Sequence, residues 1–303
     1  MKQVNLTRKN ILSALRETSD AVSGQLLAEK LGLSRVAVWK HINSLIEKGY
    51  GIESTPKGYV LTNDGDFLYP WEFDSRLSVF WQHKCSSTMD IARKLVEEES
   101  EHYDIVISDK QDKGRGRYGH SWIYTDKSIA TTFILKKSIA MQDIWKVLFA
   151  ASLAVSEELE VDGIKTSIHW PNDIYAGDKK VAGILMDISA EYMLATNIRI
   201  GIGINTGKKP DIDNATSVKI RRKRADFISC VFFRLTELIE ADKNSITTKV
   251  KNKSDIWGKE IEVHSFGKRI RGIAKDIGKN GELILENKNK ERINISDGIC
   301  TIG

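Results

Sequence analysis

A short stretch rich in glycine and arginine constrains the fold of this chain more than any other feature. Residues 111–122 read Gln-Asp-Lys-Gly-Arg-Gly-Arg-Tyr-Gly-His-Ser-Trp. The spacing of Gly114, Gly116 and Gly119 satisfies G-x-G-x-x-G, which marks a dinucleotide-binding fold only where a helix comes directly after it. In this chain a polar turn comes next, and then the strand-like run 129–135. The stretch therefore predicts a loop between strands, with a dinucleotide-binding turn and a solvated basic loop as the alternatives.

The residue types in this loop suit a negatively charged ligand. Glycine lets the backbone turn freely and approach a bound molecule closely. Arg115 and Arg117 add planar, permanently charged donors for a phosphate or a carboxylate. We expect an anion-binding loop that stays mobile until an anion fills it.

Length and composition bound the class of protein. A chain of 303 residues is expected to form two or three domains. It contains 41% hydrophobic and 29% charged residues, as ordinary soluble proteins do. No apolar run approaches the roughly 18–20 residues of a membrane span, and the first residues lack the apolar core of a signal peptide. The scattered cysteines Cys85, Cys230 and Cys300 suggest neither a disulfide framework nor a metal site. We expect a cytoplasmic protein with no membrane partner.

The first 50 residues predict three helices. Thr7 is expected to cap the first and Ser23 the second, because each precedes an apolar stripe. The turn 32–34 ends in a further cap, Ser34, and the third helix is expected over 35–48. Two short helices joined by a tight turn form a helix-turn-helix, whose second helix enters the DNA major groove.

A hairpin wing is expected after these helices. Two strand-like pieces flank Pro56-Lys57-Gly58, and residues 5–62 together resemble the winged helix-turn-helix family. Residues 1–62 hold nine Lys and Arg against five Asp and Glu, a net charge of +4 that suits phosphate contact. A small helical module for protein interaction is the alternative. The residues expected to contact DNA are Arg35, Val36, Trp39, Lys40, Asn43 and Lys57.

Two later motifs point to a phosphoryl site. Trp170-Pro171-Asn172-Asp173 comes after a strand-like run, and the proline fixes the backbone so that Asn172 and Asp173 are presented together. In Lys-Lys-Val-Ala-Gly-Ile-Leu, residues 179–185, a lysine enters a run of small and apolar residues in which Gly183 permits close approach of a ligand. Taken alone, Lys180 could be a surface lysine, and Ser87-Thr88 a simple helix cap.

In this order, the motifs resemble those of the biotin–protein ligases. The matching segments are Ser87-Thr88, Gln111 to Gly119, Trp122, Trp170 to Asp173, Lys180 to Leu185 and Gly201 to Asn205. With a winged helix in front, the chain is similar to the bifunctional form that is both ligase and repressor. The resemblance implies an α+β multidomain fold: a winged helix-turn-helix DNA-binding domain at 1–64, a central α/β ligase domain of the biotin/lipoate ligase type at 65–254, and an SH3-like β-barrel at 255–303.

The resemblance implies a two-step activity. An ATP-dependent ligase of this family forms biotinyl-5'-adenylate and then transfers biotin to a lysine of a biotin carboxyl carrier protein. ATP, Mg²⁺ and biotin are therefore implied as substrates and cofactors. Operator DNA and, in the adenylate-bound state, a second copy of the chain are implied as partners of a biotin-responsive repressor. A lipoate–protein ligase and a catalytically silent ligand-sensing repressor are the alternatives.

The resemblance also implies roles for single residues, although it assigns no metal ligands. Lys180 is implied at the biotin carboxylate and α-phosphate, Arg117 in the loop over the intermediate, and Asp173 at either the lysine nucleophile or the metal; these three are the catalytic residues. The biotin-binding residues implied are Ser87, Thr88, Gln111, Gly114, Arg115, Gly116 and Gly183. The nucleotide-binding residues implied are Arg117, Trp122, Asn172, Lys180 and Asn205.

Four further features bear on this expectation. Met89 stands where the family often has Asn and is expected to weaken a contact to the biotin ureido group. His169 stands where Lys is common and is expected to make the site pH-sensitive. The loop 206–216 is implied to be a second loop over the adenylate. The basic run 219–224 predicts either the solvated start of a helix or a docking patch for an acidic carrier protein.

Overall fold

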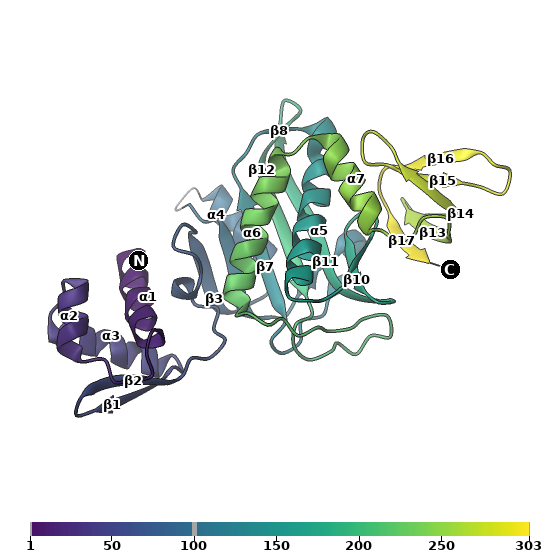
Figure 1. The fold of residues 1–303 in the computed structure, drawn as a ribbon. Helices are drawn as coiled ribbons and strands as arrows, with labels where there is room; N and C mark the ends of the chain where they lie inside the picture. Colours follow the sequence, from purple (N-terminus) through teal and green to yellow (C-terminus); the bar gives the residue numbers. More distant parts are fainter. Residues whose placement is uncertain (1, 99–101, 303) are drawn as a thin grey trace. The chain divides into compact units, whose positions relative to one another are not determined.

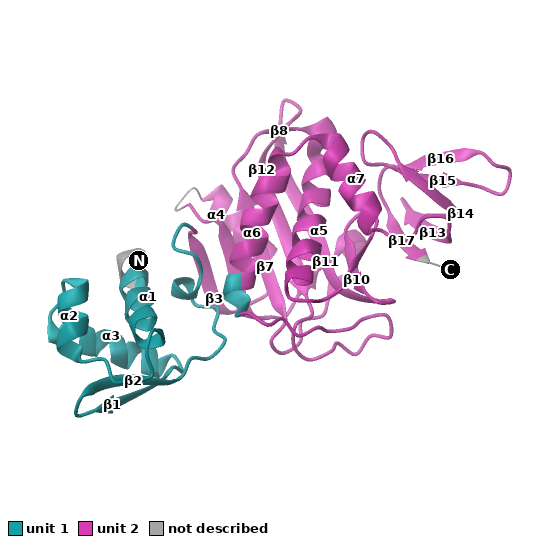
Figure 2. Cartoon of the chain, viewed as in Figure 1, with its two compact units in different colours: residues 1–76, 223–226 teal, residues 77–222, 227–303 magenta. Residues whose placement is uncertain are grey.

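The chain divides into two compact units. The computed structural model describes residues 2–98 and 102–302. Unit 1 comprises residues 1–76 together with 223–226, and unit 2 comprises residues 77–222 and 227–303 (Figures 1 and 2). Unit 1 thus includes a short segment that lies far later in the sequence. Three domains, with boundaries after residues 64 and 254, remain a proposal beside these two units.

Unit 1 is a helix-turn-helix with a hairpin wing. Its elements are α1 (Lys2–Arg16), α2 (Gly24–Leu31), α3 (Arg35–Glu47), the antiparallel strands β1 (Gly51–Thr55) and β2 (Gly58–Asn63), and the short η1 (Pro70–Glu72). Ser23 and Ser34 accept hydrogen bonds from the N–H groups of Leu26 and Ala37, which confirms both expected caps. The expected cap at Thr7 is wrong, because α1 already begins at Lys2. No glycine or proline lies between Lys2 and Thr7 to stop the helix there.

The three helices of unit 1 enclose one apolar core, as their periodicity predicts. The buried side chains that form it include Ile11, Leu12, Leu15, Leu27, Val38, Ile42 and Leu45.

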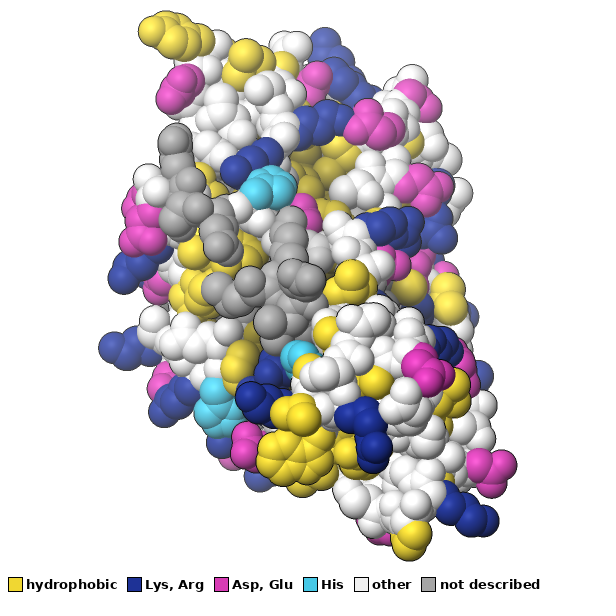
Figure 3. All heavy atoms as spheres, turned by 90° about the vertical axis from the view of Figure 1, so that its left-hand side faces the viewer, with side chains coloured by type: hydrophobic (Ala, Val, Ile, Leu, Met, Phe, Trp, Pro, Cys, Tyr) yellow, Lys and Arg dark blue, Asp and Glu magenta, His cyan; other side chains and the backbone are white. Residues whose placement is uncertain are grey.

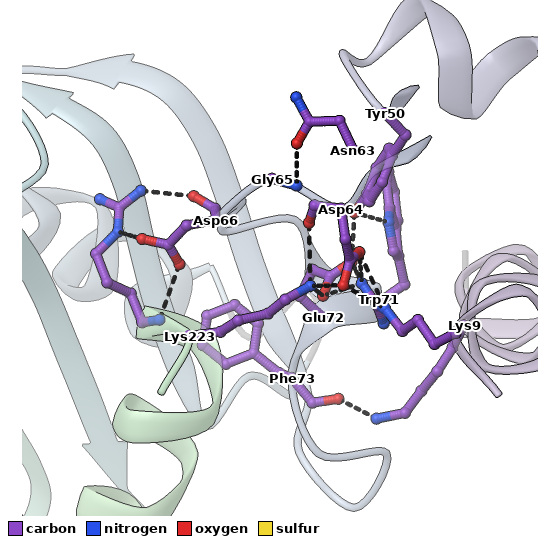
Figure 4. Close-up of polar contacts among 12 residues, drawn as sticks. Lys9, Tyr50, Asn63, Asp64, Gly65, Asp66, Trp71, Glu72, Phe73 and Lys223 are labelled. Carbon is purple, nitrogen blue, oxygen red and sulfur yellow. Dashed lines mark hydrogen bonds and ion pairs between the residues drawn. The ribbon is translucent and has the colours of Figure 1, made fainter. Parts of the chain in front are cut away.

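A buried carboxylate ties α1 to η1 (Figure 4). The Glu72 side chain is 2% exposed and accepts two hydrogen bonds from Arg16, at 2.9 and 2.8 Å, and one from the Tyr50 hydroxyl. Asp64 pairs with the same arginine at 2.6 Å. The Arg16 guanidinium therefore pairs with two carboxylates. A buried charge such as that of Glu72 needs a partner of opposite charge and hydrogen bonds.

Three cations of the basic run 219–224 are engaged in ion pairs. The pairs at 2.6 to 3.0 Å join Arg222 to Glu158 and Asp162, Lys223 to Asp64, and Arg224 to Asp66. Helix α6 (Arg224–Glu240) does begin here, but these side chains are not a solvated helix start. Only Lys219 and Arg221 remain exposed for the docking patch that was the alternative.

Unit 2 is built on a mixed sheet with helices on both faces. The strand order is β3 (Val79–Cys85), β4 (Ile105–Gln111), β7 (Ile129–Leu135), β12 (Leu194–Ile204), β11 (Lys179–Glu191), β10 (Asp173–Ala176) and β9 (Ser167–His169), with β8 (Ile139–Ala140) beside β12. Only β3 and β4 run parallel among these pairs of described strands. Phe133 contacts Phe232 of α6, whereas its neighbour Ile134 joins Ala92 of α4 (Thr88–Glu97) in a cluster. Because side chains alternate along a strand, α6 and α4 lie on opposite faces.

Two further helices complete unit 2. Helix α5 (Ile144–Val161) lies beside α6 on the sheet, and α7 (Lys243–Lys253) leads to the C-terminal strands (Figure 1). None of the helices within the described ranges is both long enough and apolar enough to cross a membrane.

The C-terminal strands form a five-stranded antiparallel sheet. Its members are β13 (Glu260–Ser265), β14 (Lys268–Ile277), β15 (Leu283–Glu286), β16 (Arg292–Ile295) and β17 (Ile299–Ile302), in the order β16-β15-β14-β13-β17. This confirms the β-rich C-terminal region. Among the described residues β16 and β17 are the outer strands of this order, and the SH3-like barrel stays a prediction.

Candidate active site

One cavity of unit 2 brings most of the expected site residues together. Its volume is about 290 Å³. The expected residues that line it are Ser87, Thr88, Gln111, Arg115, Gly116, Arg117, Trp122, Asn172, Asp173, Lys180 and Gly183. Gly114 and Asn205 are not among the described lining residues. The cavity is also lined by Ile299 and Cys300 of β17, which no motif in the sequence marks.

The glycine–arginine loop is a small hairpin rather than a helix start. Strand β5 (Gly114–Arg115) pairs with β6 (Ser121–Trp122), and a single 3₁₀ turn, η2 (Arg117–Gly119), connects them. The dinucleotide-binding alternative is therefore wrong. A Cβ at Gly114 would lie 2.4 Å from the carbonyl oxygen of Trp122, which explains why glycine is needed there.

The wall expected to hold biotin is a fixed hydrogen-bonded network. The Thr88 N–H donates to Oε1 of Gln111 at 2.9 Å, and the Thr132 hydroxyl donates to the Thr88 hydroxyl at 2.9 Å. Ser87 occupies the N-cap position of α4, but its side chain makes no capping hydrogen bond. Because this hydroxyl is buried at the cavity and is not used as a cap, the simple-cap alternative for Ser87 is wrong.

Trp122 lies against a surface made of glycine. A Cβ at Gly203 would come within 2.3 Å of the indole ring, and one at Gly183 within 3.3 Å. The indole Nε1 and the Oδ1 of Asn205 are buried, and neither has a hydrogen-bond partner among the described residues. Buried polar atoms are normally hydrogen-bonded, so the free indole N–H of Trp122, which lines the cavity, fits a polar ligand such as a nucleoside.

The cations around the cavity are each held by an acidic residue. Lys180 Nζ lies 2.6 Å from Asp173 Oδ1, so the lysine and the carboxylate act as one unit at the cavity. Arg115 pairs with Asp90 at 2.7 Å. Arg117 forms an ion pair with Asp297 and also donates to Asn172 Oδ1 at 2.8 Å. Both loop arginines thus have an acidic partner, although the Arg115 side chain is 49% exposed and that of Arg117 only 14%.

Met89 and His169, the two departures from the family pattern, have different surroundings. Met89 lines the cavity and packs on Gly201, where an added Cβ would lie 2.9 Å from the sulfur. His169 does not line this cavity. It is 4% exposed, stacks on Tyr175 at 3.7 Å and lies 2.9 Å from Asp255. Burial lowers the pKa of His169 although Asp255 opposes the shift, so the ring stays neutral near neutral pH.

We expect His169 to make the stability of unit 2 depend on pH. The groups that act on it are Asp255 and Asp173, which favour its charged form, and Lys259, which disfavours that form. Because the folded-state pKa is lowered, the unfolded chain binds the proton first, and the free energy of unfolding falls as pH drops below about 6.5. His169→Gln should flatten this dependence between pH 7 and 5 in denaturant titrations. An equally steep dependence in the variant would contradict the assignment.

The six residues expected to contact DNA all reach the surface of unit 1. Arg35, Lys40 and Lys57 are exposed and Asn43 is half-buried. Val36 and Trp39 are 63% and 53% exposed, although both are apolar. On the face drawn in Figure 3, exposed apolar side chains lie beside lysine and arginine side chains. A helix that presents apolar and basic groups together suits a DNA groove.

The fold and the cavity define a ligase-type α/β protein preceded by a helix-turn-helix domain, and comparisons with known proteins agree. The biotin/lipoate A/B protein ligase family model matches residues 82–205, and an HTH domain model matches residues 7–60. The bifunctional ligase/repressor BirA of Bacillus subtilis is 34% identical over 215 residues, which cover 67% of this chain and 66% of that protein. BirA of Escherichia coli is 28% identical over 304 residues, covering 91% of each.

A solved structure agrees with the fold of most of the chain. The biotin protein ligase of Aquifex aeolicus, in complex with biotin and ATP, superposes with a TM-score of 0.63 at 22% identity and covers 75% of this chain and 99% of its own. At that identity the likeness concerns the fold alone. Together, the comparisons show that this chain belongs to the biotin/lipoate A/B protein ligase family.

Proposed function

We propose that this chain is a cytoplasmic ATP-dependent biotin–protein ligase that also acts as a biotin-responsive repressor. The observation that carries the proposal is the cavity of unit 2, where Lys180, the loop arginines and a polar wall converge in a chain that also contains a helix-turn-helix unit. The ligase names of the relatives support the same activity.

The first step joins biotin to AMP. A biotin carboxylate oxygen forms a bond to the α-phosphorus of ATP as the bond to pyrophosphate breaks, and pyrophosphate leaves with the electron pair. Negative charge gathers at the reaction centre, and the Lys180 ammonium offsets it. Ser87, Thr88 and Gln111 orient the ureido ring of biotin. Trp122 lies on the adenosine side, where Asn172 and Asn205 also bind the nucleotide.

The second step transfers biotin to a carrier lysine. The neutral amine attacks the acyl carbon, the bond to AMP breaks, and the amine loses a proton. Asp173, the one acidic side chain among the described cavity residues, either accepts this proton or helps to hold Mg²⁺. The described residues contain no group of three or more His, Cys, Asp or Glu that could hold a metal by itself. Mg²⁺ fits here as an ion bound through ATP phosphates and one carboxylate, where it would neutralise phosphate charge.

The test is whether the purified chain accumulates an adenylate. With biotin and Mg-ATP, we expect bound biotinyl-5'-adenylate and transfer to a biotin carboxyl carrier protein. Lipoate in place of biotin tests the lipoate–protein ligase alternative. Absence of any adenylate would favour a catalytically silent sensor.

We also expect adenylate to control operator binding. One winged helix reads one half-site, and two readers in a dimer gain affinity through effective concentration. By linkage, a ligand that orders a dimer-forming surface strengthens dimerisation, and dimerisation strengthens ligand binding. Sedimentation and footprinting with and without biotin plus ATP measure this. Deleting residues 1–62 should abolish operator binding and spare at least part of the ligase activity. Equal dimerisation and equal protection in both conditions would contradict the coupling.

A further inference from the structure

The turn between β16 and β17 reaches the mouth of the ligase cavity. Gly298 offers its carbonyl oxygen to Nη1 of Arg117 at 2.9 Å, and the Asp297 carboxylate forms an ion pair with Nη2 of the same arginine. The Tyr118 hydroxyl donates to the other Asp297 oxygen at 2.6 Å. Two adjacent residues of the covering loop are thus bound by two adjacent residues about 180 positions later in the chain.

Both terminal nitrogens of the Arg117 guanidinium take part in these contacts. Nη1 donates to both Asn172 and Gly298, and Nη2 faces Asp297. The Arg117 side chain is only 14% exposed. Its charge is therefore paired within the chain, and these contacts tie the loop to the turn.

The turn is itself held in a fixed shape. The Ser265 hydroxyl of β13 donates to the Asp297 carbonyl oxygen at 2.5 Å. A Cβ at Gly298 would lie 2.4 Å from Val263, so the backbone approaches β13 as closely as only glycine allows. A tether attached to this turn is attached to the whole C-terminal sheet.

We infer that Asp297 is a positioning residue that, through Arg117 and Tyr118, latches the covering loop to the C-terminal sheet and so sets how long the acyl-adenylate is retained. Retention matters because an escaped acyl-adenylate acylates any exposed amine or hydrolyses. The inference rests on the proposed ligase function and names a residue outside every motif that led to it.

The test compares Asp297→Asn with Asp276→Asn in the full chain. Asp276 is a matched control because it lies in β14 of the sheet that carries the Asp297 turn, is 48% exposed against 43% for Asp297, and also has one close cation, Lys251. Asp297→Asn should raise the dissociation rate of radiolabelled biotinyl-adenylate about five- to tenfold, as expected for a partly exposed charge pair with shared hydrogen bonds. Labelling of serum albumin lysines should rise in parallel, while pyrophosphate release in the first turnover changes by less than about twofold.

A double-variant cycle shows whether Asp297 acts through the arginine. In an Arg117→Ala background, Asp297→Asn should add less leakage than it does in the wild-type background, because only the hydrogen bond from Tyr118 to Asp297 remains to be lost. Additive leakage, or wild-type retention in Asp297→Asn, would overturn the latch. If the wild-type chain makes no adenylate, the proposed function fails instead, so the two failures are distinct.

Discussion

Replacing Lys180 by alanine is expected to slow adenylate formation by about two to three orders of magnitude. The ammonium lies at the cavity, 2.6 Å from Asp173 and next to Gly183, where the phosphoryl charge would develop. Removing one preorganised group of this kind costs about 3–4 kcal/mol of transition-state stabilisation. Biotin binding should largely survive, because the wall of Ser87, Thr88 and Gln111 remains. Pyrophosphate release gives the rate, and calorimetric titration with biotin gives the affinity.

The neighbouring lysine provides the control for this prediction. Lys179 precedes Lys180 in β11 and is absent from the described lining of the cavity, because successive side chains of a strand face opposite sides. Lys179→Ala should keep the wild-type rate within about twofold. Near wild-type pyrophosphate release in Lys180→Ala would show that the developing charge is stabilised by another group.

Much of the fold and most of the candidate site could be predicted from the chemistry of short sequence segments. Ser23 and Ser34 each precede an apolar stripe, and a serine there satisfies the free N–H groups of the helix start whatever the tertiary structure is. Gly183 was expected to permit close approach, and in the structure both Gly183 and Gly203 face the Trp122 ring. The caps can be predicted because each serine bonds an N–H group three residues away, and the glycine because a missing side chain permits close approach whichever residue comes near.

The missed features depend on contacts between distant segments. Lys223 reads as the start of a helix, yet it pairs with Asp64, about 160 positions earlier. The Asp297 contact with Arg117 spans a similar distance, and one aspartate in a turn carries no local mark of it. The buried position of His169 shows the same limit, since the packing of Tyr175 and Asp255 around it is set by the assembled sheet. Charge and periodicity along the chain do not encode such pairings.

The second large effect is expected for Arg16→Ala, which should lower the free energy of unfolding of unit 1 by about 3 kcal/mol. Breaking a buried ion pair from one side leaves the other charge uncompensated. Here Glu72 would keep only the Tyr50 hydroxyl and a longer contact, 3.5 Å, to Lys223. Hydrogen exchange of the α1 amides in the full chain measures this unit alone. Operator binding should be lost as the unfolded fraction of unit 1 grows.

Lys30→Ala is the matched control, because its pair with Glu17 is exposed on both sides. That variant should change the free energy of unfolding by less than about 0.5 kcal/mol.

The network of Arg16, Asp64 and Glu72 should also respond to acid. Burial acts to raise the pKa of Asp64, but hydrogen bonds from Arg16 and Lys223 outweigh it and hold the pKa below its usual 3.8. A depressed carboxylate pKa stabilises the folded state above 3.8, and this contribution is lost as pH falls through the folded-state value. Wild-type unit 1 should therefore lose more α1 protection below pH 4 than Arg16→Ala does. Equal α1 protection in Arg16→Ala and Lys30→Ala at neutral pH would mean that the buried network does not stabilise unit 1.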